Sequence, residues 1–138
     1  MDALVIDTDV VSFLFKRDTR AWLYRPYLQD KYLVVSFMTV AELYQWAYIR
    51  RWGKKRLVQL ELVIKKYIVP PFDVELCRIW AGIRVERQAK GAPISVQDAW
   101  IAATALRYGI PLVTHNNGDF KEIDGLIVVS IAQEGSKS

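Results

Sequence analysis

The segment ALVIDTDV at residues 3–10 begins as a short apolar run and changes abruptly to acidic residues at Asp7. An apolar run without polar alternation is typical of a central parallel strand, which helices cover on both faces. Similar runs occur at residues 33–35, 67–69, 112–113 and 126–129. The chain is therefore expected to contain five short buried strands.

Helical patterns lie between these runs, and a first helix is expected to begin near Val10. Apolar residues recur with the 3.6-residue period of a helix face at residues 39–51, 54–66, 74–90 and 97–108. Gly91 and Gly109 follow two of these patterns, as glycine often does just beyond a helix end. Strands that alternate with helices predict an α/β domain with a parallel sheet and right-handed crossovers.

The composition indicates one globular domain. The chain has 138 residues, of which 52% are hydrophobic, and its net charge is +4. This length and hydrophobic content predict a single packed domain over residues 1–132, followed by a polar tail over residues 133–138. The positive charge mildly favours a polyanionic partner.

The sequence also favours a soluble, cytoplasmic protein. Asp7 and Asp9 interrupt the first apolar stretch before a signal peptide is complete, and no run reaches the roughly 18 apolar residues of a membrane span. Cys77 is the only cysteine, which suits a reducing compartment. Its place in an apolar helical pattern predicts a buried, unreactive thiol.

Four acids occupy comparable places in this arrangement. Asp7 ends the first strand, Glu42 lies in the first turn of the helix after the second strand, Asp98 opens the Ala-rich helix, and Asp119 follows the fourth strand. Strand carboxyl ends and the adjoining helix N-termini share one edge of a parallel sheet. We therefore expect the four carboxylates to converge in one crevice.

Each acid also has a purely structural interpretation. Thr39 and Glu42 fit a capping box, in which Glu42 reaches back to the Thr39 N–H. The other acids fit similar roles: Asp98 after Ser95 as a looser box, Asp7 and Asp9 as caps of the helix near Val10, and Asp119 in a turn. Taken singly, each acid is more easily explained in this way.

As a set, the acids favour a divalent cation, because four converging carboxylates repel one another and a hard cation relieves that repulsion. His115 and Cys77 are the only histidine and cysteine, so a zinc site of nitrogen and sulfur ligands is excluded. Magnesium or manganese is therefore expected, with Asp7 and Asp98 as central ligands. Such a site suits phosphodiester hydrolysis by a metal-activated water.

Four segments of the chain resemble the ordered motifs of the PIN-domain family. They are residues 4–10, residues 36–43 with Glu42, residues 94–105 with Asp98, and residues 112–120 with Asp119. Each motif alone is weak, but the four together, in order and at suitable spacing, are specific. The resemblance implies a PIN-like three-layer α/β/α fold with a central five-stranded parallel sheet.

In that family the four acids bind Mg²⁺ or Mn²⁺ and cleave single-stranded RNA. The resemblance carries this catalytic and metal-binding role over to Asp7, Glu42, Asp98 and Asp119. It also assigns supporting positions to Asp9, Thr114 and Asn116. At Asp9 the family uses Asn, Ser or Asp.

Stand-alone bacterial and archaeal members of about this length are mostly VapC-type toxins of toxin–antitoxin systems. They usually form dimers, and the C-terminal segment of an antitoxin covers their active site. The resemblance thus implies an RNA substrate, a cognate antitoxin and a homodimer. Crowded acids without a metal should attract a cation, so we expect the antitoxin to present Arg or Lys to them.

The densest basic run lies at a turn between two predicted helices and comprises Arg50, Arg51, Trp52, Lys54, Lys55 and Arg56. It fits a surface that follows RNA phosphates, with Trp52 stacking on a base. It fits a solvated helix end equally well. A second basic group, Arg84, Arg87 and Lys90, is open to the same two interpretations.

Two other functions compete with the nuclease. The segment Asp7-Thr8-Asp9-Val10 also resembles the nucleophile motif of haloacid-dehalogenase-type phosphatases, with Asp7 as the nucleophile and Asp119 and Asp124 in the metal motif. That interpretation leaves Glu42 and Asp98 as mere caps. The other alternative is a PIN-like module that binds RNA without cleaving it.

Overall fold

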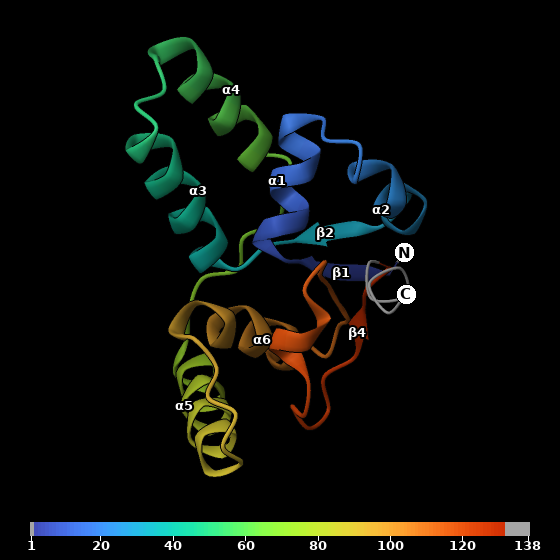
Figure 1. Ribbon diagram of the computed structural model, residues 1–138, viewed down its shortest axis with the longest axis vertical. Helices are drawn as coiled ribbons and strands as arrows, with labels where there is room; N and C mark the ends of the chain where they lie inside the picture. Colours follow the sequence, from blue (N-terminus) through green and yellow to red (C-terminus); the bar gives the residue numbers. More distant parts are fainter. Residues whose placement is uncertain (1, 132–138) are drawn as a thin grey trace.

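The computed structural model describes residues 2–131, and Figure 1 shows helices packed on both faces of a central sheet. Because the described part ends at residue 131, the predicted polar tail at 133–138 lies outside it. The elements follow one another as β1 (Ala3–Ile6), α1 (Thr8–Lys16), α2 (Ala21–Leu28), β2 (Tyr32–Val34), α3 (Phe37–Ile49), α4 (Lys54–Ile64), α5 (Val74–Ala89), α6 (Val96–Tyr108), β3 (Leu112–Val113), the 3₁₀ helix η1 (Asn117–Phe120) and β4 (Val128–Val129).

The strands pair in the order β2-β1-β3-β4, and every pairing is parallel. Leu4 lies opposite Leu33 of β2, and Val5 lies opposite Leu112 of β3. The predicted parallel α/β sheet is therefore confirmed. Its carboxyl edge faces the N-termini of α1, α3 and α6 (Figure 1).

The sheet has four strands in the described chain, so the prediction of five is wrong in this detail. The expected strand at residues 67–69 is reduced to one parallel bridge between Val34 and Ile68. The Ile68 N–H donates to Leu33 O and its carbonyl accepts from Val35 N–H, each at 2.9 Å. Pro70 follows two residues later and has no N–H to extend the ladder.

Side chains of β1 alternate between two cores. Leu4 and Ile6 pack among residues of α1–α4, whereas Val5 packs among residues of α5 and α6. Figure 1 shows the same division, with α1–α4 on one side of the sheet and α5 and α6 on the other. This is the predicted three-layer arrangement, and it explains why β1 is apolar on both faces.

The predicted helices all form, and α1, α3 and α6 begin one or two residues earlier than expected. The N-cap of α3 is Ser36, whose Oγ accepts from the Met38 N–H at 3.0 Å. Thr39 lies inside the helix, and its N–H donates to the Ser36 carbonyl. The capping box predicted for Thr39 and Glu42 is therefore wrong, which frees the Glu42 carboxylate for other contacts.

Two further features differ from expectation. The helix α2 has no counterpart among the predicted helices and contains Pro26. Cys77 is exposed on α5 rather than buried, because the buried positions of that helix belong to Leu76, Ile83 and Arg87. Within residues 2–131, no helix has the length and apolarity needed to cross a membrane.

Candidate active site

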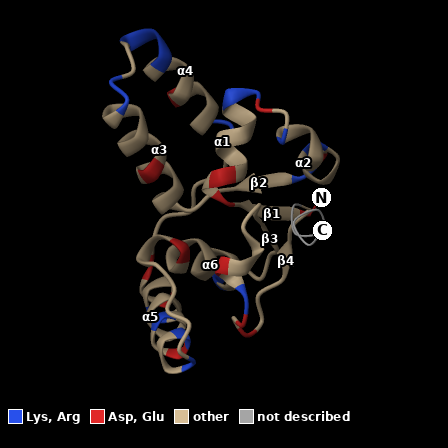
Figure 2. Ribbon diagram, viewed as in Figure 1, with Lys and Arg blue, Asp and Glu red and all other residues tan. Residues whose placement is uncertain are grey.

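Carboxylates gather at the carboxyl edge of the sheet, where loops leave β1 and β3 and where α3 and α6 begin. Figure 2 shows acidic segments at the start of α1, in α3, at the start of α6 and in the loop after β3. These segments carry Asp7, Asp9, Glu42, Asp98 and Asp119. The topology thus brings together the acids that the sequence spaces across the whole chain.

Asp7 is the buried centre of this group, with 6% of its surface exposed. Its Oδ2 accepts a hydrogen bond from Thr114 Oγ1 at 2.7 Å, and its Oδ1 accepts from the Thr8 N–H at 2.8 Å. The Asn116 N–H in turn donates to Thr114 Oγ1 at 2.9 Å. Thr114 therefore holds the carboxylate and is itself held by the next loop.

Burial and like charge both disfavour ionisation of these acids. The pKa of Asp7 is raised to about 7, mainly by burial and also by the neighbouring charge of Asp9. Burial raises the pKa of Asp98 to about 6, and the charges of Asp7 and Asp119 contribute in the same direction. These four carboxylates are therefore close enough to repel one another.

Asp9 belongs to the same group. Burial raises its pKa to about 6, although hydrogen bonds from backbone N–H groups oppose the shift. The Val10 N–H donates to its Oδ1 at 2.7 Å, and the His115 N–H donates to its Oδ2 at 3.2 Å. Its carboxylate thus links the first turn of α1 to the loop after β3.

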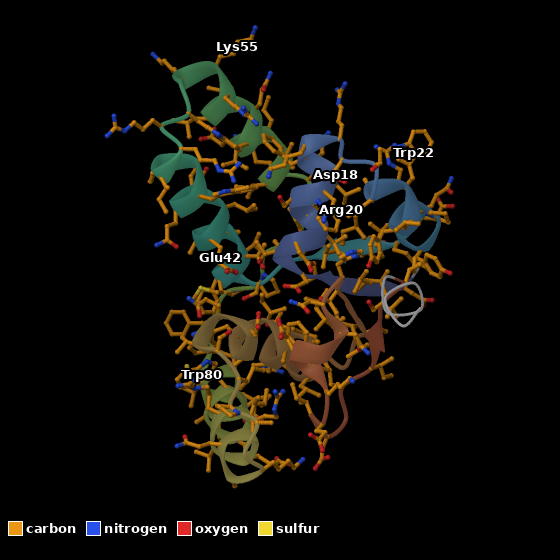
Figure 3. The ribbon with its side chains drawn as sticks, viewed as in Figure 1. Asp18, Arg20, Trp22, Glu42, Lys55 and Trp80 are labelled. Carbon is orange, nitrogen blue, oxygen red and sulfur yellow. The ribbon has the colours of Figure 1, made fainter. Side chains whose placement is uncertain are left out.

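Glu42 is held by hydroxyl groups rather than by a helix cap. Thr8 Oγ1 donates to Glu42 Oε1 at 2.8 Å and lies 2.9 Å from Thr39 Oγ1. Thr39 is fully buried, and burial raises the pKa of Glu42. Figure 3 shows Glu42 in the early part of α3, close to α6. Thr8 and Thr39 were not among the predicted site residues. Their hydrogen bonds join α1 to α3, and sequence patterns do not show which residues of two separate helices meet.

Asp119 is the exposed member of the group and lies in η1. The Asn116 side-chain amide donates to Asp119 Oδ2 at 2.6 Å. From the other side, Arg87 donates to the Asp119 carbonyl at 3.1 Å. The predicted supporting residues Thr114 and Asn116 thus each contact one of the acids.

The donor set fits a hard divalent cation. Five carboxylates and two threonine hydroxyls supply oxygen donors, which Mg²⁺ and Mn²⁺ prefer. His115 uses Nδ1 in a 2.7 Å hydrogen bond with the Tyr24 hydroxyl, and Cys77 is exposed on α5. Within residues 2–131, no three acidic, histidine or cysteine side chains already form a metal-binding cluster. A cation would therefore have to draw the repelling carboxylates together.

Concave surfaces lie on both sides of Glu42. One of about 400 Å³ is lined by Thr8, Asp9 and Trp46 among others, and one of about 470 Å³ by Tyr44, Tyr48 and Gln97 among others. Glu42 and Gln45 line both. A chain-like substrate that crosses the acids has room on either side of α3.

The basic run lies at the far end of α3 from the acids (Figure 2). Its five cationic residues are exposed, and none of them forms an ion pair within residues 2–131. Trp52 is different, because its ring stacks on Phe15 at 5.5 Å and carries the Arg56 guanidinium at 4.1 Å. A base could stack on Trp52 only after displacing one of these neighbours.

Asp124, the second acid of the metal motif in the phosphatase interpretation, lies outside the carboxylate cluster. Asp124 lines a separate cavity of about 220 Å³, together with Arg78, Ile83 and Glu122 among others. That cavity includes residues of α5 and contains none of the five clustered carboxylates. The geometry therefore does not support the phosphatase alternative.

Fold and site together define a three-layer α/β domain with a carboxylate-lined site at the carboxyl edge of its parallel sheet. Residues 4–126 match the family model of the PIN domain. The chain belongs to the PIN-domain family, as its sequence motifs predicted.

The sequences of several relatives align with most of this chain. The toxin FitB of Neisseria gonorrhoeae is 33% identical, covering 88% of this chain and 93% of that protein. The VapC ribonuclease Y4jK of Sinorhizobium fredii is 31% identical, covering 92% and 96%. A chain in the structure of VapBC-1 from nontypeable Haemophilus influenzae is 27% identical, with a TM-score of 0.80 and coverage of 93% and 97%.

Proposed function

We propose that this protein is a Mg²⁺- or Mn²⁺-dependent endoribonuclease that cleaves single-stranded RNA, and that it is the toxin of a VapBC-type pair. Its relatives named as a VapC ribonuclease and a toxin support the activity. The carboxylate cluster carries the proposal. Asp7, Asp9 and Asp98 all have pKa values raised to about 6 or 7, which is the expected state of cation ligands without their cation.

Four of the carboxylates have direct roles in this proposal, and Asp9 supports them by linking α1 to the loop after β3. Asp7 and Asp98 hold the cation at the centre of the site, while Glu42 and Asp119 bind it from the sides or orient water. Thr114 fixes Asp7 and Thr8 fixes Glu42 through the hydrogen bonds already described. A bound cation would supply Lewis-acid chemistry for hydrolysis of a phosphodiester bond.

The basic run is the proposed path of the RNA backbone away from the acids. A rise of about 1.5 Å per residue places Arg50 about 12 Å along α3 from Glu42. Arg50, Arg51, Lys54, Lys55 and Arg56 would neutralise phosphates there. Trp52 supports this surface through its contacts with Phe15 and Arg56.

We further propose a cognate antitoxin, a homodimer and a cytoplasmic location, as for VapC-type toxins. The antitoxin is expected to cover the carboxylates with an Arg or Lys side chain, because a cation relieves their repulsion. Mn²⁺ should then compete with the antitoxin, so titration of Mn²⁺ should weaken the purified complex. A complex in which the acids are uncovered would contradict this part of the proposal.

Cleavage of a single-stranded RNA with Mg²⁺ or Mn²⁺, and its loss with a chelator, tests the activity. Asp98→Ala and Glu42→Ala should each abolish cleavage, whereas the control Asp124→Ala should retain it. The phosphatase alternative predicts the reverse, and also predicts hydrolysis of phosphate monoesters. RNA binding without cleavage in any of these metals would indicate the non-catalytic module instead.

A further inference from the structure

Arg87 is an unusually buried cation for a helix that faces solvent. It lies near the end of α5 with 6% of its surface exposed. Among residues 2–131, no carboxylate pairs with it. A buried charge without a counter-ion is costly, so its hydrogen bonds must compensate. Neither interpretation of the basic group around it, an RNA surface or a solvated helix face, fits this position.

All of its described hydrogen bonds go to backbone carbonyls. Arg87 Nε donates to the Ala92 carbonyl at 2.7 Å. Its Nη1 donates to the carbonyls of Asp119 at 3.1 Å and Lys121 at 3.0 Å. One planar guanidinium group therefore links the turn after α5 to the backbone of residues 119–121, at the end of η1. Arginine suits this task because its donors form a rigid fork.

The contacts place Arg87 directly behind Asp119. The carboxylate of Asp119 accepts from Asn116 on the loop side, at 2.6 Å, while its own carbonyl accepts from Arg87 on the α5 side. Asp119 is exposed, and η1 spans only Asn117–Phe120. Besides Arg87, this segment is held by the Asp119 N–H, which donates to the Asn116 carbonyl at 3.1 Å, and by the buried side chain of Phe120. Loss of Arg87 would leave the Asp119 and Lys121 carbonyls without this donor and free the segment to shift.

We propose that Arg87 is a positioning residue that sets where the Asp119 carboxylate lies and thereby how tightly the site holds a divalent cation. The inference rests on the proposed function, in which Asp119 helps to bind that cation. Arg87 acts through the backbone of η1 and touches neither the cation nor the RNA. Groups that orient ligands in this indirect way typically change metal affinity by about 10- to 100-fold.

The experiment uses full-length variants and measures the dissociation constant for Mn²⁺ by calorimetric titration. Arg87→Met keeps the aliphatic stem and removes the donors, whereas Arg87→Lys keeps the charge without the fork. We expect Mn²⁺ affinity to fall by about 10-fold or more in both. In the metal-free protein, amide hydrogen exchange at residues 116–122 should accelerate relative to the rest of α5 and α6.

A double-mutant cycle separates positioning from general stability. If Arg87 acts through Asp119, then Arg87→Met should weaken Mn²⁺ binding no further in an Asp119→Asn background. The matched control is Arg107→Met, which removes an arginine that pairs with Asp73 across α5 and α6. This control should lower the free energy of unfolding without changing Mn²⁺ affinity.

The outcomes discriminate between the two proposals. Unchanged Mn²⁺ affinity in Arg87→Met, with affinity lost in Asp119→Asn, would overturn the role of Arg87 alone, and so would additive losses in the double variant. Equal Mn²⁺ binding by the wild type and Asp119→Asn would instead overturn the role of Asp119 in the proposed function. If Arg87→Met does not fold, the same comparisons made with Arg87→Lys decide the question.

Discussion

Asp7 is held by two hydrogen-bond donors, yet its pKa is raised to about 7 from an ordinary 3.8. Burial outweighs the donors, and the charge of Asp9 adds to the effect. Near neutral pH and without a cation, this carboxyl group is therefore expected to be about half protonated. Binding of a divalent cation would release that proton.

The stability of the metal-free protein should consequently fall as pH rises. The folded state holds a proton on Asp7 up to pH about 7, whereas the unfolded state releases it near 3.8. The stabilisation is complete below the unfolded pKa and is lost as pH rises through the folded pKa. Between pH about 5 and about 7.5, we expect Tm to fall by about 4 °C or more, the shift that about 1 kcal/mol produces.

Thermal denaturation in a chelating buffer measures this effect. Asp7→Asn should make the fall in Tm shallower, because asparagine carries no titrating proton. Asp9 and Asp98, whose pKa values are raised to about 6, should still contribute at the lower end of the range. Asp18, whose pKa is lowered by hydrogen bonds from Arg20, titrates below this window and does not interfere. Added Mn²⁺ should raise Tm more at the upper end of the range. A flat or rising metal-free profile in the wild type would contradict the prediction.

Thr8 allows a second test at the scale of one hydroxyl group. Its Oγ1 donates to Glu42 and also contacts the buried Thr39 hydroxyl. Thr8→Val has nearly the same shape but leaves both partners without this contact. We expect Mn²⁺ affinity and RNA cleavage to fall by about 10-fold, as for other residues that orient metal ligands.

Thr8→Ser is the matched control, since it keeps the hydroxyl group and should restore most of both properties. Circular dichroism should show the same secondary structure in all three proteins. Wild-type cleavage by Thr8→Val would show that the hydroxyl contact does not position Glu42.

At the scale of elements, the sequence predicts the sheet better than it predicts where elements begin and end. Residues 3–6 are apolar on both faces, and that pattern needs no long-range information. The strand at 67–69 looks equally apolar, but the preceding turn of α4 and the following Pro70 leave space for a single bridge at Ile68. Strand length therefore depends on flanking backbone geometry that hydrophobicity does not reveal.

The start of α3 illustrates the same limit. Ser36 and Thr39 are both good capping residues, and the sequence pattern favoured Thr39 because Glu42 follows at the right spacing. In the structure Ser36 caps the helix, and Glu42 turns to Thr8 on a different helix. Carboxylates near strand ends were predictable from topology, but their hydroxyl and arginine supports depend on contacts between distant segments.

The observed cap gives a prediction for α3. Ser36→Ala removes the oxygen that accepts from the Met38 N–H, so unfolding should require about 1 kcal/mol less free energy. Ser36→Thr should lose much less, because threonine keeps a capping hydroxyl group and places no charge at this buried position. Urea denaturation measures both variants. Equal stability of Ser36→Ala and the wild type would place the helix start elsewhere.

At the scale of the whole molecule, charge is divided between two regions. Acidic groups face one another at the sheet edge, whereas basic groups extend over the outer end of the α3–α4 pair (Figure 2). Figure 3 shows Lys55 projecting outward at the start of α4. An RNA strand that reaches the acids must overcome repulsion from them, so attraction at a distance is needed to hold it.

This division predicts how RNA binding depends on salt. Each phosphate neutralised by a cationic side chain contributes about −0.7 to the slope of log K against log salt for a single strand. Lys55→Glu should therefore weaken binding of a non-cleavable RNA and make the slope shallower by about that amount. Fluorescence anisotropy at several salt concentrations measures both quantities.

The control is Arg25→Glu, which makes the same charge reversal on α2, outside the proposed path of the RNA. It changes the net charge equally but removes no phosphate contact, so it should leave the slope unchanged. If both variants flatten the slope equally, the RNA senses the overall charge of the protein and the basic run is a solvated helix end.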